Sequence, residues 1–309
     1  MPFDVPVFDP AEPAPVIAAG LPLVVLLTGF TDAGAAVAQT IDFVREGADH
    51  ELVRRYENDV LLDYRARRPI IEFDKDHLSD YRAPRLELSL TRDALDRPYL
   101  LLSGYEPDFA WEAFVASVVE FVRAARVSAV TWVHAIGMPV PHTRPLGTTV
   151  SGNRAAITQA HSVWQPHTQV PATAGHLLEY RLAEVGIEVA GFVLLVPHYL
   201  GDTEYPAAAI AALDGITAAT GLVFVVDMLR EENEEFLAKV GEQIAGNEDL
   251  ARMLTGLEER YDAYMAGATQ ATPLLHEADL PSADELAAEL ERFLANRHGG
   301  DDEARGPLG

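Results

Sequence analysis

The segment LVVLLTGFTDAG, residues 23–34, constrains the fold of this chain more than any other stretch. It begins with an uninterrupted apolar run, 23–27, whose length and branching are typical of a strand buried on both faces. A Thr-Gly turn then leads to Asp32, which can accept the free N–H groups of a helix from Ala33 to Glu46. Strand, glycine turn and helix in this order predict the first unit of an open parallel α/β sheet.

Farther along the chain, apolar runs alternate with amphipathic stretches, as they do in α/β proteins. The stretch from Pro107 to Ala125, for example, places Trp111, Phe114 and Val118 on one face of a predicted helix. The alternation predicts a three-layer α/β/α sandwich with a mostly parallel sheet and an α-helical C-terminal extension. The other predicted strands are 51–56, 60–63, 70–73, 86–91, 99–103, 129–136, 189–196 and 222–226, and the other predicted helices of the core are 175–185 and 206–220.

Changes in composition divide the chain into three predicted parts. Residues 1–227 are expected to form the α/β/α core, of which 1–21 are an extended, proline-rich leader. Residues 228–298 are expected to form a helical segment, and 299–309 a disordered acidic tail. From Asp227 onward, 20 Asp and Glu residues face 7 Lys and Arg, a net charge of −13 that is typical of a solvated segment.

The whole chain carries a formal charge of −25, which excludes several kinds of partner. Nucleic acid and anionic membrane surfaces would repel it. The chain contains no cysteine, so disulfides and thiolate chemistry are excluded. Its N-terminus has no signal-peptide pattern, and no apolar run approaches the roughly 20 residues of a membrane span. We therefore expect a cytoplasmic protein that binds neither nucleic acid nor membrane.

Four common catalytic signatures are missing from the sequence. There is no G-x-x-x-x-G-K-[ST], no G-x-G-x-x-G after the run 23–27, no H-E-x-x-H and no G-x-S-x-G. P-loop nucleotide hydrolysis, dinucleotide binding, zincin proteolysis and α/β-hydrolase chemistry therefore lose their usual support. We expect no cofactor and no metal, assign no catalytic residue, and favour a protein that is not an enzyme.

Polar residues at the predicted strand ends remain as candidates for a functional site. In open α/β sheets, ligands bind at the carboxyl ends of the strands, where helix N-termini point N–H groups outward. Converging histidines with an aspartate could bind a metal or act as acid and base. The alternative is structural: the aspartate caps a helix and the histidines bond to loop carbonyls. The candidate pocket comprises Thr28, Gly29, Thr31, Asp32, Gly34, His134, His142, Thr143, Arg144, Thr149, Asn153, His198 and Tyr199.

A long stretch without periodicity, 137–173, follows the predicted strand 129–136 and is expected to be a functional loop. Within it, GTTVSG at 147–152 could hold an anion through its backbone N–H groups beside Arg144. An ordinary polar turn is the favoured interpretation of the same residues. Residues 155–161 are expected to form a short strand or a turn of helix.

Three motifs lie near the predicted strand ends: TGFTDAG at 28–34, GMPVPHTRP at 137–145 and VPHYL at 196–200. Together they resemble the PAC2 family, which is named for the second proteasome assembly chaperone. The resemblance extends from Leu23 to about Met265 and is strongest to the bacterial branch found in actinobacteria. The composition, rich in Ala and Arg and poor in Lys, agrees with a high-GC bacterial source.

The resemblance implies a phosphorylase/hydrolase-like α/β/α fold and a homo-oligomer. It also implies a link to proteasome assembly, since eukaryotic and archaeal relatives assist assembly of the proteasome α-ring. Some of those relatives dock into the ring through a C-terminal tail of a hydrophobic residue, Tyr and any residue. This chain ends Pro307-Leu308-Gly309, so we do not expect it to dock by such a tail.

The leading hypothesis is a non-catalytic protein-interaction or assembly factor of the PAC2 type, with three or more identical subunits and a protein partner, proteasomal or other. Apolar stripes at 236–244 and 250–265 support association, because an isolated appendage could not bury them. They are expected to pack on the core or across a subunit interface. The alternative is a small-molecule-binding protein or a phosphorylase/hydrolase-like enzyme with a pocket at the carboxyl ends of the strands.

Overall fold

The computed structural model describes residues 7–10, 13, 15–29, 31–164 and 167–267. The chain divides into two compact units, 1–262 and 263–309. The predicted tail 299–309 and the predicted helical residues beyond 267 lie outside the described residues, as does part of the predicted leader. In the described part of the chain, no helix is both long enough and apolar enough to span a membrane.

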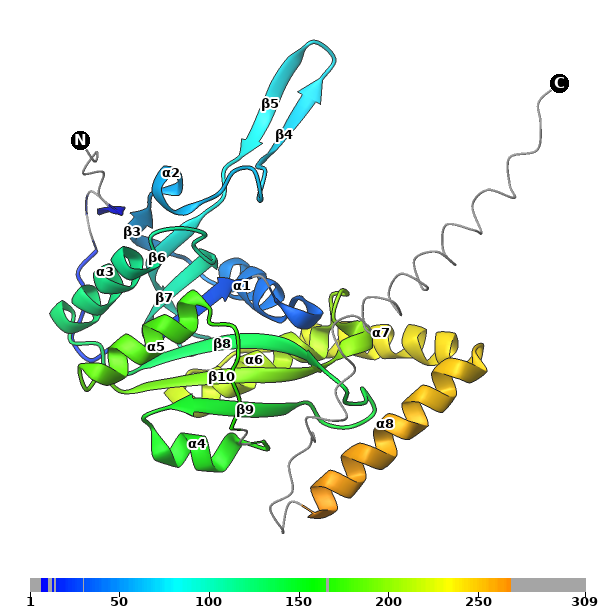
Figure 1. The fold of residues 1–309 in the computed structure, drawn as a ribbon. Coiled ribbons are helices and arrows are strands. Elements are labelled where there is room, and N and C mark those ends of the chain that lie inside the picture. The colour runs from blue at the N-terminus through cyan, green and yellow to red at the C-terminus, as the bar shows by residue number, and fades with distance from the viewer. Residues whose placement is uncertain (1–6, 11–12, 14, 30, 165–166, 268–309) are drawn as a thin grey trace. The chain divides into compact units, whose positions relative to one another are not determined.

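An eight-stranded mixed sheet forms the centre of the first unit (Figure 1). Its strand order is β1-β3-β6-β7-β2-β8-β10-β9. A separate two-stranded sheet, β4-β5, forms a hairpin. The strands are β1 (Phe8–Pro10), β2 (Leu23–Thr28), β3 (Glu51–Tyr56), β4 (Ile70–Asp74), β5 (His77–Arg82), β6 (Leu86–Arg92), β7 (Pro98–Tyr105), β8 (Val130–Met138), β9 (Gly147–Gly152) and β10 (Val189–Pro197).

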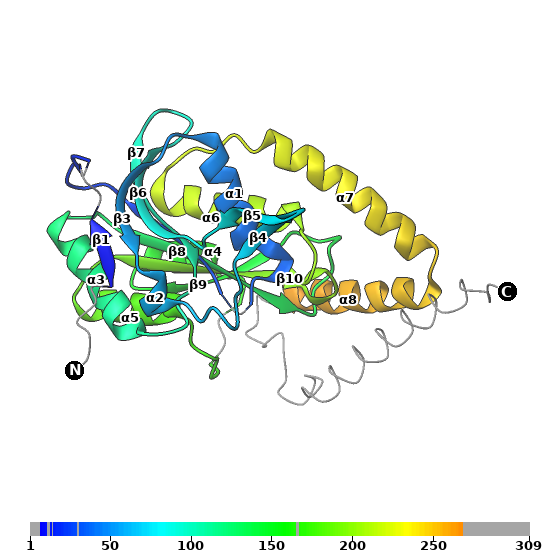
Figure 2. The ribbon, with the colours of Figure 1, turned by 90° about the horizontal axis from the view of Figure 1, so that it is seen from above.

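Helices cover both faces of the main sheet, which confirms the predicted α/β sandwich (Figures 1 and 2). The sheet is parallel in its middle, across β7-β2-β8-β10, and antiparallel on both sides. Short connections such as the one between β6 and β7 join only antiparallel strands. The helices are α1 (Ala36–Gly47), α2 (Asn58–Leu61), α3 (Trp111–Ala124), α4 (Ala155–His161), α5 (Ala174–Glu184), α6 (Pro206–Thr220), α7 (Asp227–Ala245) and α8 (Glu248–Gly267), with short 3-10 turns at Ala33–Ala35 and His198–Leu200.

Strand β2 is buried on both faces, as its continuous apolar run predicts. Val24 and Leu26 belong to the core that contains α1 and α6, whereas Leu23 and Val25 belong to the core that contains α3 and α5. The side chains alternate between the two cores because a strand has a period of two residues. This burial fixes the position of the strand end at Thr28.

The apolar stripe at 236–244 packs on the core of the same chain. Val240 is buried, and Phe236 and Ile244 pack against the cluster around α1 and α6. The ring centroid of Phe236 lies 5.4 Å from that of Tyr205. This stripe therefore needs no second subunit to cover it.

Two of the predicted strands are wrong. Residues 60–63 overlap helix α2, because a short apolar run does not distinguish a strand from a helix. Residues 222–226 form no strand: the N–H of Val223 donates to the Asp93 carboxylate, and its carbonyl accepts from Ala94. The backbone of this segment is thus bound to the turn between β6 and β7 and not to the sheet.

The long predicted loop after β8 also contains regular structure. Residues 147–152 form strand β9, which pairs antiparallel with β10, so neither an anion-binding loop nor a turn describes them. Gly147 is required there, since a Cβ would lie 2.7 Å from a methyl group of Val163. Residues 155–161 form helix α4, the helical one of the two expected alternatives.

Asp32 caps helix α1, as predicted, although from a position before the helix. A 3-10 turn, Ala33–Ala35, separates the two. The backbone N–H groups of Val37 and Ala38 donate to the two carboxylate oxygens of Asp32 over 2.8 and 2.9 Å. These are N–H groups of the first turn, which have no partner inside the helix.

Replacing Asp32 with alanine should therefore lower the free energy of unfolding by about 1 to 2 kcal/mol, because two N–H groups of the first helical turn lose their acceptor. Asp42→Ala is the control, since Asp42 is exposed on the same helix. Urea denaturation of both variants measures the difference. Equal stability of the two variants would contradict the capping role.

Candidate functional site

The carboxyl ends of the central strands carry two groups of polar side chains. The first, the His134 cluster, consists of Thr31, Glu106, Trp132, His134 and His176. The Thr31 hydroxyl lies 3.3 Å from Nε2 of His134. The His134 ring is stacked on Trp132 at 6.2 Å and lies edge-on to His176 at 5.9 Å. Strands β7 and β8, the turn after β2 and helix α5 thus meet at this point.

Glu106 connects this cluster to helix α5. It is 5% exposed, and its Oε1 accepts the N–H of Ala174, the first residue of α5, over 2.6 Å. A carboxylate at a helix N-terminus is stabilised by the helix dipole. Gly29 leaves space for this carboxylate, because a Cβ there would lie 2.7 Å from Oε2 of Glu106. The buried acid therefore has a structural partner.

The space inside the His134 cluster is small. Gly29, Glu106, His134 and Gly175 line a pocket of about 10 Å³. That volume is close to the minimum for one water molecule. The pocket can hold a buried water, but not a nucleoside or a sugar.

Both imidazoles of the cluster favour the neutral form. Burial, together with the neighbouring His176, lowers the pKa of His134 to about 4. Burial also lowers the pKa of His176. Burial raises the pKa of Asp32, and the N–H groups of Val37 and Ala38 oppose this shift. At neutral pH the histidines therefore act as uncharged hydrogen-bonding groups.

The second group lies on the loop 142–145, which follows β8. The backbone N–H of His142 donates to the hydroxyl oxygen of Tyr199 over 2.8 Å, and its Nδ1 lies 2.7 Å from the same oxygen. His198 Nδ1 lies 3.3 Å from the carbonyl oxygen of Met138. Burial lowers the pKa of His142, whereas Glu258 raises it. These contacts hold the loop against the end of β10.

Helix α8 supplies the partners of the loop's arginine. The Arg144 guanidinium makes two hydrogen bonds with Asp262, of 2.8 and 2.6 Å, and lies 3.3 Å from Glu258. The Thr143 hydroxyl donates to the same Glu258 carboxylate over 2.5 Å, and the Tyr261 hydroxyl to the Pro145 carbonyl over 3.2 Å. Sequence analysis considered Arg144 as a neighbour of a bound anion. In the structure its guanidinium is instead paired with two carboxylates of the same chain, those of Glu258 and Asp262.

The other residues of the predicted pocket have separate structural positions. The Thr28 hydroxyl donates to the carbonyl of Gly104, and the Thr149 hydroxyl to that of Trp164. Gly34 adopts φ +70° where a Cβ would touch Tyr205 and Val196. Asn153 bonds to the backbone of Ile187 and Val189, at the amino end of β10. Asn153 therefore lies at the amino ends of the parallel strands and not at their carboxyl ends, where it was expected, because β9 runs antiparallel to β10.

Sequence reasoning missed Glu106, Trp132 and His176, and the acidic partners on α8. Glu106 directly follows β7, just as Thr28 ends β2. Its place after a predicted strand could therefore have indicated it as a candidate. His176 gave none, since it lies inside a helix and reaches the cluster through tertiary packing. In the described ranges, no three His, Asp or Glu side chains are placed to hold a metal ion.

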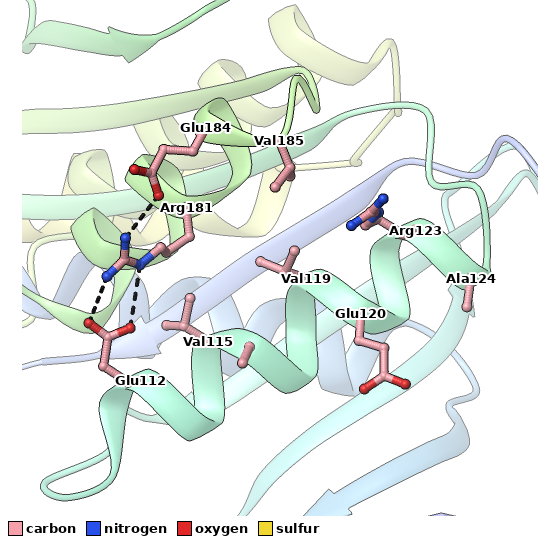
Figure 3. Close-up of a pocket in the computed structure, with 10 residues that line it drawn as sticks. Glu112, Val115, Val119, Glu120, Arg123, Ala124, Arg181, Glu184 and Val185 are labelled. Atoms are coloured by element: carbon pink, nitrogen blue, oxygen red, sulfur yellow. Dashed lines mark hydrogen bonds and ion pairs between the residues drawn. The ribbon is translucent and has the colours of Figure 1, made fainter.

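A wider, open depression of the described surface lies elsewhere, between α3 and α5 (Figure 3). This α3–α5 groove has a volume of about 640 Å³. Val115, Val119 and Val185 line it, and charged side chains stand around them. Arg181 bridges Glu112 and Glu184 across the two helices, with N–O distances of 2.9 Å to each.

The strand order and the hydrogen-bonded polar residues at the strand ends define an α/β/α fold class. They do not by themselves define a function. The family is shown by the sequence: the PAC2 family model matches residues 26–244. The chain therefore belongs to the PAC2 family, as its three motifs predict. No curated protein matches it.

Solved structures agree with this assignment. A Mycobacterium tuberculosis protein of unknown function, Rv2714, is 37% identical with a TM-score of 0.80, over 86% of this chain and 92% of its own. A Corynebacterium glutamicum protein of unknown function is 32% identical with a TM-score of 0.80, over 84% and 98%. A proteasome-assembly chaperone homologue from M. tuberculosis, Rv2125, is 22% identical with a TM-score of 0.68, over 76% and 100%. The last similarity is one of fold.

Proposed function

We propose that this protein acts by binding other proteins, as a non-catalytic, oligomeric assembly factor of the PAC2 family. The observation that carries the proposal is the closed state of the strand ends. The polar side chains there bond to one another, and the pocket of the His134 cluster has room for about one water molecule. Function is then expected on the outer surface, where apolar side chains are exposed.

The partner class follows from the family. Rv2125 is named a proteasome-assembly chaperone homologue. We extend that role to this chain as the first candidate, with proteasome α subunits as the partner. The strongly acidic chain would then favour a partner with a basic surface.

The second function, binding or conversion of a small molecule, has less support. Its residues Asp32, His142 and Arg144 are engaged with the α1 backbone, Tyr199 and α8 respectively. A thermal-shift screen against nucleosides, phosphate, sugars and divalent metals tests it, because a ligand that binds the folded state raises the melting temperature. A shift that His142→Ala abolishes and the exposed control His167→Ala retains would establish this function instead.

Reconstitution tests the proposed function directly. The tagged full chain is mixed with purified proteasome α subunits of its source organism, and ring assembly is followed by native gel and light scattering. We expect a complex and faster ring formation. A parallel pull-down from native lysate covers other partners. Absence of any α-subunit complex, together with an empty pull-down, would overturn the proposal.

A further inference from the structure

Only one oxygen of the buried Glu106 carboxylate has a hydrogen-bond donor in the described part of the chain. Oε1 accepts the N–H of Ala174. Oε2 lies beside Gly29, since a Cβ at Gly29 would be 2.7 Å from it, and none of the described residues donates to it. Glu106 is 5% exposed, and a buried carboxylate oxygen without a donor is costly. Because Gly29 and Glu106 both line the small pocket of the His134 cluster, the missing donor belongs in that pocket.

Two other polar groups at the same pocket also need a partner. Gly175 is the second residue of α5, and its N–H belongs to the first helical turn, where no carbonyl of the helix can accept it. The N–H groups on either side of it bond to side chains, whereas that of Gly175 has no acceptor among the described residues. His134 contacts Thr31 through Nε2, and its Nδ1 has no partner in the same ranges. Both Gly175 and His134 line the pocket.

The size and the charges of the pocket select its ligand. About 10 Å³ is the space of one water-sized molecule. The Glu106 carboxylate disfavours an anion, and the N-terminus of α5 disfavours a cation. In the described ranges, no three His, Asp or Glu side chains can hold a metal ion. A water molecule can donate to one group and accept from another at the same time, so it fits a site that offers both an acceptor and a donor.

We propose that the pocket binds one water molecule, which donates to Oε2 of Glu106 and accepts the N–H of Gly175. Nδ1 of His134 is its third partner. The inference goes beyond the proposed function, because this water joins β7, β8 and α5 beside the turn after β2, whose motif is one of those that identify the family. Gly29 of that motif is then required, since a side chain there would push the Glu106 carboxylate out of its place.

A high-resolution crystal structure of the full chain tests the site. We expect a single peak of electron density about 3 Å from both Oε2 of Glu106 and the backbone nitrogen of Gly175. A second crystal, soaked in rubidium chloride, distinguishes water from a monovalent cation, because rubidium scatters anomalously. The proposal predicts no anomalous signal at this position. Absence of the peak, or a rubidium signal in its place, would overturn the proposal.

Gly29→Ala tests the same site in solution. The added methyl group should displace the Glu106 carboxylate and expel the water, so the melting temperature should fall by about 2 to 4 °C. Gly47→Ala is the matched control, because a Cβ there has no atom within 4 Å, and its melting temperature should not fall. An equal melting temperature in the two variants would count against the site.

NMR cross-relaxation between water and the Gly175 amide separates loss of the water from crowding alone. The signal should be present in the parent and in Gly47→Ala and absent from Gly29→Ala. A parent without the signal, or a Gly29→Ala variant that retains it, would refute the bound water. These measurements need no partner protein, so their outcome is independent of the reconstitution that tests the proposed function.

Discussion

Gly104→Ala should lower the free energy of unfolding by about 4 kcal/mol, the largest effect that we expect from a single methyl group. Gly104 lies in β7 opposite Leu86 of β6 and has φ +145°. A Cβ there would lie 2.0 Å from the carbonyl oxygen of Arg85 and 2.7 Å from Cα of Leu86. Both atoms belong to the backbone, so relief requires the two strands to separate.

Two control positions separate the backbone strain of a positive φ from the steric overlap of the added Cβ at Gly104. Gly186 has φ +73° with no atom within 4 Å of a Cβ, so Gly186→Ala adds the backbone strain alone, about 1 to 2 kcal/mol. Gly256 lies in α8 with no close atom, and Gly256→Ala should stabilise by about 0.5 to 1 kcal/mol. Urea denaturation of the three variants gives the comparison. A loss at Gly104 no larger than that at Gly186 would refute the steric argument.

Acidification should destabilise the protein through the buried His134. Its folded-state pKa of about 4 lies below the ordinary value of 6.5, so below pH 6.5 the unfolded chain binds a proton that the folded chain does not. Stability is therefore complete near pH 7 and falls as the pH drops from about 6.5 to about 4. The expected loss from this group between pH 7 and pH 5 is about 2 kcal/mol.

The variant His134→Gln isolates this contribution, because it keeps a polar side chain but cannot titrate. Its free energy of unfolding should change less between pH 7 and pH 5 than that of the parent, by about 2 kcal/mol. His167→Gln, at an exposed position, controls for the loss of a histidine as such and should follow the parent. Identical pH dependence in the parent and His134→Gln would show that His134 is not the cause.

The polar residues at the strand ends are bonded within the chain, and the family motif on loop 142–145 is an example. Loop 142–145 carries one of the motifs that identify the family, yet its Arg144 is bound by Glu258 and Asp262. Those two acids lie four residues apart on α8, on one face of the helix. Two carboxylates of the acidic C-terminal segment thus bind the arginine of this loop. The net charge of the segment alone did not indicate such a specific contact.

The sequence by itself determined the α/β class, the buried strand at 23–27, the cap at Asp32 and the family. Each of these depends on residues near one another in the chain, where hydrophobic period and capping chemistry act directly. The predicted pocket as a functional site stays a prediction, since its residues form two bonded groups and several separate contacts.

Tertiary structure alone decided the rest. The antiparallel flanks, the strand at 147–152 and the lack of one at 222–226 depend on which backbone groups meet across the fold. Likewise, Glu106 meets the start of α5 from 68 residues away, and Arg144 meets Asp262 from 118. Packing brings such partners within reach whatever their distance in sequence. The buried Glu106 takes a backbone N–H because it has no water to bond to, whereas the more exposed Arg144 and Asp262 attract each other as opposite charges.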